Sequence, residues 1–145
     1  MIIDIVCHGN IESYQTLLDN YADNFRYEEV LAYSLIMANK YDYPQAYFDV
    51  FDILTSIPNQ NASTCAPKEC RDEGFYCLDD KTKQMAIDFF KQAVFKENIY
   101  ASKKLLHVYN KDSTFPIEIL YSDKKLINKA ISNLEKDSSH RNIIF

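Results

Sequence analysis

Three nine-residue segments of the chain align without gaps, and this repetition constrains the fold more than any other feature of the sequence. The segments begin at Asn10, Tyr43 and Asn98. Each has a small residue in the fourth position and two large apolar residues in the eighth and ninth positions: Ser13, Ala46 and Ala101, then Leu17–Leu18, Val50–Phe51 and Leu105–Leu106. Small residues at fixed positions let neighbouring helices approach closely, so the pattern predicts repeated helical hairpins.

The spacing of these segments locates an insertion. The first two segments begin 33 residues apart, at positions 10 and 43, and the last two begin 55 residues apart, at positions 43 and 98. A unit of about 33 residues suffices for one helical hairpin. The excess falls within residues 59–79, which are rich in Asn, Ser, Thr and Pro, contain three of the four cysteines and have no sustained hydrophobic period. We expect a loop insertion there.

Apolar residues at helical spacing predict about seven helices on either side of this insertion. The expected ranges are 2–8, 11–21, 27–39, 44–57, 80–96, 98–109 and a last helix that Ser122 caps and that extends through Leu134. Asn10 and either Asp79 or Asp80 are expected N-caps, and Pro44 suits a first helical turn. Residues 110–121 could form a short helix or an extended piece, and residues 137–145 are expected to be a frayed tail.

Composition limits the class of protein. The 145 residues suit one domain, 1–145, and the presence of only 2 Gly and 4 Pro favours helices. A formal charge of −5 argues against nucleic-acid binding, which depends on Lys and Arg. No apolar run approaches the roughly 20 residues that span a bilayer, and the segment MIIDIVCHGN lacks the basic region of a signal peptide. We therefore expect a cytoplasmic protein without membrane contact.

The hairpin segments resemble tetratricopeptide-type repeats, in particular the Sel-one-like variety. The likeness is carried by HGNIESYQTLLDNY, by EEVLAYSLIMANKYDYPQAYFDVFDIL and by MAIDFFKQAVFKENIYASKKLLHVYN, and SDKKLINKAISNLE is similar to the helix of a further unit. It covers roughly residues 1–54 and 80–134. The glycines typical of such repeats are mostly absent, and the insertion departs from the family pattern. The resemblance implies an all-α, right-handed α–α superhelix that binds other proteins.

No catalytic machinery is evident in the sequence. Nucleotide-binding glycine motifs and a nucleophile elbow are absent, and the three histidines are scattered: His8, His107 and His140. We expect no enzymatic activity, no cofactor and no metal. The insertion leaves three alternatives for Cys65, Cys70 and Cys77: free thiols, which are favoured, a disulfide within the loop, or zinc, which the absence of a nearby histidine disfavours.

Tyrosines beside acidic residues are the candidate partner-binding residues, because aromatic side chains are enriched in interface hot spots. The candidates are Tyr41, Asp42, Tyr43, Asp49, Asp52, Asp19, Asp23, Glu69, Asp72 and Glu73. Acidic clusters more often form a solvated face. Tyr14, Tyr47 and Tyr100, near the hairpin turns, could bind a partner but more often such residues belong to the core.

The favoured hypothesis is a small acidic immunity (antitoxin) protein that binds and neutralises a basic toxin such as a nuclease. The net charge, the size and the lack of catalytic groups motivate it. The first alternative is an adaptor or scaffold of the Sel-one type that binds a peptide or a partner domain. The second alternative is a metal- or thiol-dependent protein that uses the cysteine insertion.

Overall fold

The computed structural model describes residues 1–24, 26–60, 75, 78–110, 120 and 122–143. Within these ranges every regular element is a helix and none is a strand. The described residues form seven helices: α1 (Ile2–His8), α2 (Ile11–Asp23), α3 (Tyr27–Asn39), α4 (Pro44–Gln60), α5 (Asp80–Phe95), α6 (Ile99–Asn110) and α8 (Lys124–Ile143). The predicted all-α class with about seven helices is confirmed. The right-handed superhelix stays a prediction.

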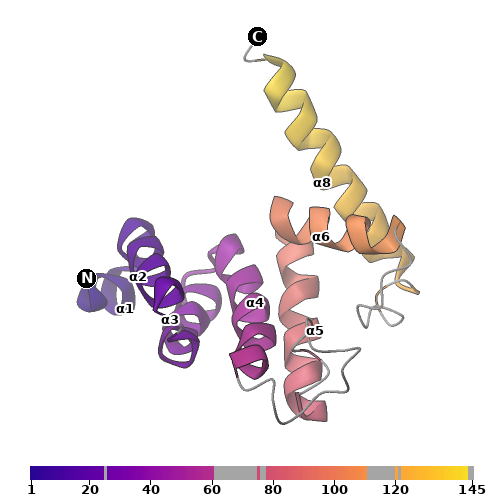
Figure 1. The fold of residues 1–145 in the computed structure, drawn as a ribbon. Helices are drawn as coiled ribbons and strands as arrows, with labels where there is room; N and C mark the ends of the chain where they lie inside the picture. The colour runs from indigo at the N-terminus through magenta and orange to yellow at the C-terminus, as the bar shows by residue number, and fades with distance from the viewer. Residues whose placement is uncertain (25, 61–74, 76–77, 111–119, 121, 144–145) are drawn as a thin grey trace.

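The helices follow one another through space largely as they do along the chain (Figure 1). Each of α2 to α5 packs on the helix before it, α6 contacts the end of α5, and α8 packs on both α5 and α6. The far end of α8 extends away from the other helices (Figure 1).

The three hairpin turns share one backbone geometry. Gly9, Asp42 and Glu97 each come directly before one of the aligned segments, and they have φ angles of 60°, 52° and 65°. Positive φ is uncommon for residues other than glycine. In each turn the backbone N–H of the next residue donates to a carbonyl of the preceding helix. Asn10 donates to Asp4, Tyr43 donates to Met37, and Asn98 donates to Ala93. The repeated sequence segments therefore coincide with repeated helix–turn–helix units.

Polar side chains cap several helix N-termini. Asn10 Oδ1 accepts from the Ser13 N–H at 2.8 Å, and Asp79 accepts from the N–H groups of Lys81 and Thr82, as the sequence predicts. The predicted cap at Ser122 is wrong. Asp123 has that role, since its Oδ1 accepts from the Leu126 N–H at 3.0 Å and a carboxylate suits the positive end of a helix.

Two helices are longer than their apolar patterns suggested. α4 continues to Gln60, beyond the predicted end at residue 57, and includes Pro58. α8 continues to Ile143, although its apolar stripe ends at Leu134 and the tail from residue 137 was expected to fray. In both cases polar residues extend the helix beyond the part that the pattern could show.

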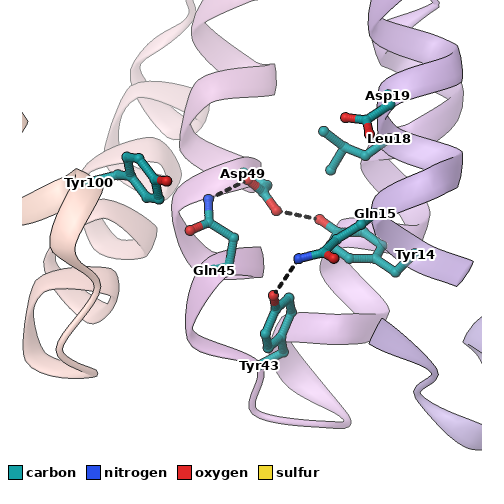
Figure 2. A pocket seen from close by; sticks show the side chains of 8 residues that line it. All are labelled: Tyr14, Gln15, Leu18, Asp19, Tyr43, Gln45, Asp49 and Tyr100. Atoms are coloured by element: carbon teal, nitrogen blue, oxygen red, sulfur yellow. Dashed lines mark hydrogen bonds between the residues drawn. The ribbon is translucent and has the colours of Figure 1, made fainter. Parts of the chain in front are cut away.

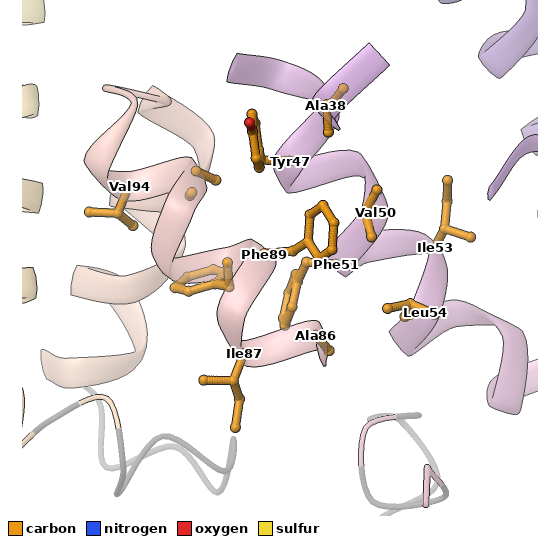
Figure 3. Close-up of a cluster of buried hydrophobic side chains, with 14 of the residues drawn as sticks. Ala38, Tyr47, Val50, Phe51, Ile53, Leu54, Ala86, Ile87, Phe89 and Val94 are labelled. Atoms are coloured by element: carbon orange, nitrogen blue, oxygen red, sulfur yellow. The ribbon is translucent and has the colours of Figure 1, made fainter. Parts of the chain in front are cut away.

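Aromatic rings fill the core between α4 and α5 (Figure 3). The ring centroids of Phe51 and Phe90 are 4.8 Å apart, and those of Tyr47 and Phe89 are 5.8 Å apart. The small residues Ala46 and Ala101 are fully buried, as the hairpin pattern requires. Packing of rings against small residues joins neighbouring hairpins.

The buried face of α3 is offset from the centre of its apolar pattern. Val30, Ser34 and Met37 are almost completely buried, whereas Leu31 and Leu35 are only partly buried. Apolar residues surround much of this helix, so its sequence gives a weak direction for the buried face. This offset matters because it turns the hydroxyl of Ser34 toward α2.

Candidate functional site

An open cleft of about 500 Å³ crosses the second helices of the three hairpins, α2, α4 and α6 (Figure 2). Four lining residues come from α2, three from the start of α4 and its turn, and one from α6: Tyr14, Gln15, Leu18 and Asp19; Tyr43, Gln45 and Asp49; and Tyr100. Three of these eight side chains are phenols and two are carboxylates, and none is cationic. The cleft is thus aromatic and acidic.

A buried phenol joins the floor of the cleft to α3. The Tyr14 hydroxyl lies 2.8 Å from Asp49 Oδ2 and 2.8 Å from Ser34 Oγ. Ser34 Oγ in turn donates to the Val30 carbonyl at 3.3 Å. Burial raises the pKa of Tyr14 well above its usual value, so its proton stays in place. This chain of hydrogen bonds holds Asp49 against α2.

Asp49 is half-buried, and burial raises the pKa of its carboxyl to about 6. Hydrogen bonds from Gln45 and Tyr14 act in the opposite direction, and the nearby charge of Asp52 adds to the rise. Gln45 Nε2 donates to Asp49 Oδ1 at 2.9 Å. In the part of the chain that the structure describes, no Lys or Arg forms an ion pair with this carboxylate. Its two hydrogen-bond donors are neutral.

A hydrogen-bonded chain from the next hairpin fixes Gln45. Asn98 Nδ2 donates to Gln45 Oε1 at 2.8 Å, while Asn98 Oδ1 accepts from the Ala101 N–H at 2.8 Å as the N-cap of α6. Because the amide oxygen of Gln45 is held this way, its amide nitrogen is directed to Asp49. One helix cap thus orients a side chain that lines the cleft.

The rim of the cleft is less constrained than its floor. The Tyr43 hydroxyl accepts from Gln15 Nε2 at 3.1 Å, and the rings of Tyr14 and Tyr43 meet edge to face with centroids 6.1 Å apart. Tyr100 is 64% exposed, and Asp19 is also exposed. The rim therefore offers phenols and a carboxylate to an incoming group.

The structure brings three of the predicted binding residues into this cleft, namely Asp19, Tyr43 and Asp49. Asp23 and Asp52 are exposed on α2 and α4 but do not line it. Of the three tyrosines near the turns, Tyr14 and Tyr47 are buried in the core and Tyr100 stands at the rim. Three acidic candidates lie outside the described residues: Glu69, Asp72 and Glu73. So do the insertion cysteines Cys65, Cys70 and Cys77, which leaves the choice among thiol, disulfide and zinc as it was.

Tyr41 and Asp42 have internal partners in the turn between α3 and α4. The Tyr41 hydroxyl donates to the Val6 carbonyl at 2.8 Å. Asp42 accepts from the Tyr47 hydroxyl at 2.8 Å and from Lys96 Nζ at 2.5 Å. These two predicted binding residues join one hairpin to its neighbours, whereas Tyr43 beside them lines the cleft.

Sequence reasoning missed Gln15, Leu18 and Gln45 as residues of the cleft. The i,i+4 spacing of Gln45 and Asp49 could have indicated their hydrogen bond. The sequence holds no signal for Gln15, whose role depends on the approach of Tyr43 from another helix.

The described residues contain no group of three or more His, Cys, Asp or Glu side chains that could hold a metal ion. None of the described helices is both long and apolar enough to cross a membrane. No family model, curated protein or solved structure matches the chain. The cleft is therefore interpreted from its own chemistry.

Proposed function

We propose that the chain is a non-enzymatic protein-binding module that holds a basic partner in the cleft between α2, α4 and α6. The observation that carries this proposal is the half-buried carboxylate of Asp49, which faces an open cleft among phenols and has no cationic partner among the described residues. Aromatic side chains supply contact area at an interface, and a partly desolvated carboxylate favours a cation over a neutral group.

The biological form we propose is immunity, in which this small acidic protein binds and neutralises a basic toxin in the cytoplasm. The formal charge of −5 supports this form, because it would accelerate the encounter with a positively charged protein. A nuclease toxin would present the basic surface that such a cleft favours.

An adaptor of the Sel-one or tetratricopeptide type is the second candidate. The shared turn geometry at Gly9, Asp42 and Glu97 favours it, because it belongs to a chain built from repeated helical hairpins. An adaptor would bind a peptide or a domain whose charge need not be basic.

Co-expression with the product of a neighbouring gene tests the immunity proposal. We expect the chain to rescue cells from a basic toxin and to co-purify with it, with an affinity that falls as salt rises. Asp49→Asn should weaken the complex by a factor of about 30 or more, because loss of one partner of a desolvated charge pair costs about 2 kcal/mol or more.

Asp88→Asn is the matched control for that variant. Asp88 is exposed on α5, and it accepts from Gln84 four residues earlier at 2.9 Å, as Asp49 accepts from Gln45. The Asp88→Asn variant should leave the affinity for the toxin unchanged within a factor of two. Binding that is indifferent both to salt and to Asp49→Asn would reject a charge-based mode and favour the adaptor.

A further inference from the structure

We propose that the cleft is a receptor for one cationic side chain of the partner, a lysine ammonium or an arginine guanidinium, with Asp49 as its counter-charge. This inference rests on the proposed function, since it names the chemical group that the same cleft recognises. It is argued from the hydrogen bonds, the wall of the cleft and the groups that face Asp49.

The carboxylate of Asp49 retains acceptor capacity for such a cation. Gln45 donates to Oδ1 and Tyr14 donates to Oδ2, so each oxygen accepts one hydrogen bond from the described residues. An ionised carboxylate offers about four lone-pair sites, and a guanidinium or ammonium can occupy the remaining ones. Figure 2 shows both oxygens of Asp49 at the centre of the cleft, between the side chains from α2 and Tyr100.

The walls of the cleft suit the rest of a lysine or arginine side chain. Leu18 provides an apolar surface for the methylene stem, which long cationic side chains bury while the charged head remains polar. Tyr43 and Tyr100 supply phenol faces that attract a cation through the ring quadrupole. Tyr100 is largely exposed, so its ring is accessible to a bound group from the side of α6.

The charged groups that face Asp49 favour the same class of ligand. Asp19 lines the cleft from α2, and the negative charge of Asp52, which Lys104 of α6 partly offsets, acts on Asp49 from the same helix. The other titratable groups in the cleft are the phenols of Tyr14, Tyr43 and Tyr100, which are neutral when protonated. A second anion would be repelled, whereas a cation would compensate the charge of Asp49.

Occupation by a cation would also change the protonation of the cleft. A positive charge next to Asp49 stabilises its ionised form, so it lowers the pKa of this carboxyl below the value of about 6 in the free protein. Binding below about pH 6 would therefore release a proton, and the affinity would fall as the pH decreases through this range.

Three small probes test the receptor on the full chain: butylammonium, butylguanidinium and neutral butanol. We expect both cations to bind with millimolar affinity in an NMR titration, and the carboxyl resonance of Asp49 to titrate at lower pH in their presence. Butanol should not bind. The tighter of the two cations identifies lysine or arginine as the preferred group, and either result supports the proposal.

Variants locate the site and exclude binding elsewhere. Asp49→Asn should lower the affinity for both cations at least tenfold, and the control Asp88→Asn should change this affinity less than twofold. If Asp49→Asn does not fold, Tyr43→Leu supplies the test, with an expected loss of threefold or more. Equal binding of butanol, or equal losses in the Asp49 and Asp88 variants, would overturn the proposal.

Measurements with a whole partner separate this inference from the proposed function. If the probes fail to bind while a basic protein binds the native chain and Asp49→Asn equally well, the receptor is rejected and the binding function stands on another surface. If the probes bind at Asp49 while a basic protein encoded by a neighbouring gene does not, the receptor stands and the immunity proposal is rejected.

Discussion

Asp49 connects the protonation of one carboxyl to a chain of hydrogen bonds that runs through Tyr14 and Ser34. When Asp49 is ionised, the single proton of the Tyr14 hydroxyl is donated to it. When Asp49 is protonated, it can donate to Tyr14, which then donates to Ser34, and Ser34 donates to the Val30 carbonyl. Asparagine at position 49 can reproduce this second arrangement, because its amide nitrogen donates and its oxygen accepts from Gln45.

Asp49→Asn should therefore change the pH dependence of stability. A carboxyl whose pKa rises from 3.8 to about 6 on folding holds its proton more tightly in the folded state. Its contribution favours folding below pH 4 and is lost as the pH rises to about 6, at a cost of about 2 to 3 kcal/mol. We expect the variant to be more stable than the native chain at pH 7.5 and no more stable at pH 4, by urea denaturation at both pH values.

The exposed control Asp88→Asn should show no such difference between the two pH values. Glu97 has the opposite sign, because hydrogen bonds and ion pairs with Lys136 and Lys129 hold its pKa at about 2. Its contribution is present above its ordinary pKa of 4.5 and is lost as the pH falls toward 2. The Asp49 effect is therefore centred at a higher pH than the Glu97 effect, with an overlap only between 3.8 and 4.5. A difference confined to pH below 4 would contradict the assignment to Asp49.

Gly9 is required for two reasons that can be separated. Its φ of 60° is strained for a residue with a side chain, and a Cβ there would lie 2.5 Å from the ring of Tyr41. We expect Gly9→Ala to cost about 2 to 4 kcal/mol by urea denaturation. In a Tyr41→Ser background the cost should fall to the 1 to 2 kcal/mol of backbone strain alone. An equal loss of stability in both backgrounds would show that the Tyr41 ring moves aside without a measurable energetic cost.

At the scale of elements, helix caps serve the site as well as the helices. Asn98→Ala removes the cap of α6 and the donor to Gln45, and Asn98 is only 6% exposed. We expect a loss of about 2 kcal/mol in the free energy of unfolding, near the upper end for a cap. The exposed cap Asp79 is the comparison, and Asp79→Ala should cost about 1 kcal/mol.

Asn98→Asp separates the two tasks of this residue. Its carboxylate still accepts from the Ala101 N–H, but it cannot donate to Gln45. Thermal unfolding should show that it is more stable than Asn98→Ala, while NMR should show an altered environment for Gln45 in both variants. An unchanged Gln45 resonance in Asn98→Asp would contradict the proposed orientation of this amide by the cap.

Local patterns in the sequence predict elements well and their mutual rotation poorly. The bounds of α3, residues 27–39, match the prediction, because the helical pattern stops at the turn before Pro44. The repeat correctly located the three hairpin turns, since each turn precedes a recognisable segment. Ser34 is buried on the face that its helical spacing with Val30 and Ala38 indicates. The partial exposure of Leu31 and Leu35 does not follow from the pattern, because apolar residues on most of the circumference of α3 leave the centre of its buried face undetermined.

At the scale of the whole molecule, the cleft could not be predicted because its contacts join distant parts of the chain. Tyr14 meets Ser34 and Asp49 from 20 and 35 residues away, and Asn98 meets Gln45 from 53 residues away. Helical spacing orders residues along one helix but does not give the distance between two helices. The sequence made Asp49 a candidate binding residue because it is acidic and lies near tyrosines. Its neutral hydrogen-bond donors and its half-buried position follow from the packing of three hairpins.

The continuous core predicts that these hairpins unfold together. Phe90 is fully buried, and the centroid of its ring lies 4.8 Å from that of Phe51, at the contact of α4 with α5. Phe90→Ala should cost about 3 to 5 kcal/mol, because the lost burial adds to the cavity that remains. Circular dichroism and tyrosine fluorescence should both report one transition, moved to lower temperature by the same amount.

Phe90 does not line the cleft, so the affinity for butylammonium or butylguanidinium measured well below the new midpoint should stay within a factor of two of the native value. Tyr100→Ala is the complementary control, because Tyr100 is exposed at the rim of the cleft. This variant should change the affinity for the two cations with little effect on the midpoint of thermal unfolding. Two separate unfolding transitions in Phe90→Ala would mean that the hairpin that contains α4 and the hairpin that contains α5 unfold as independent units. In that case the cleft, which uses α2, α4 and α6, would depend on their docking rather than on a common core.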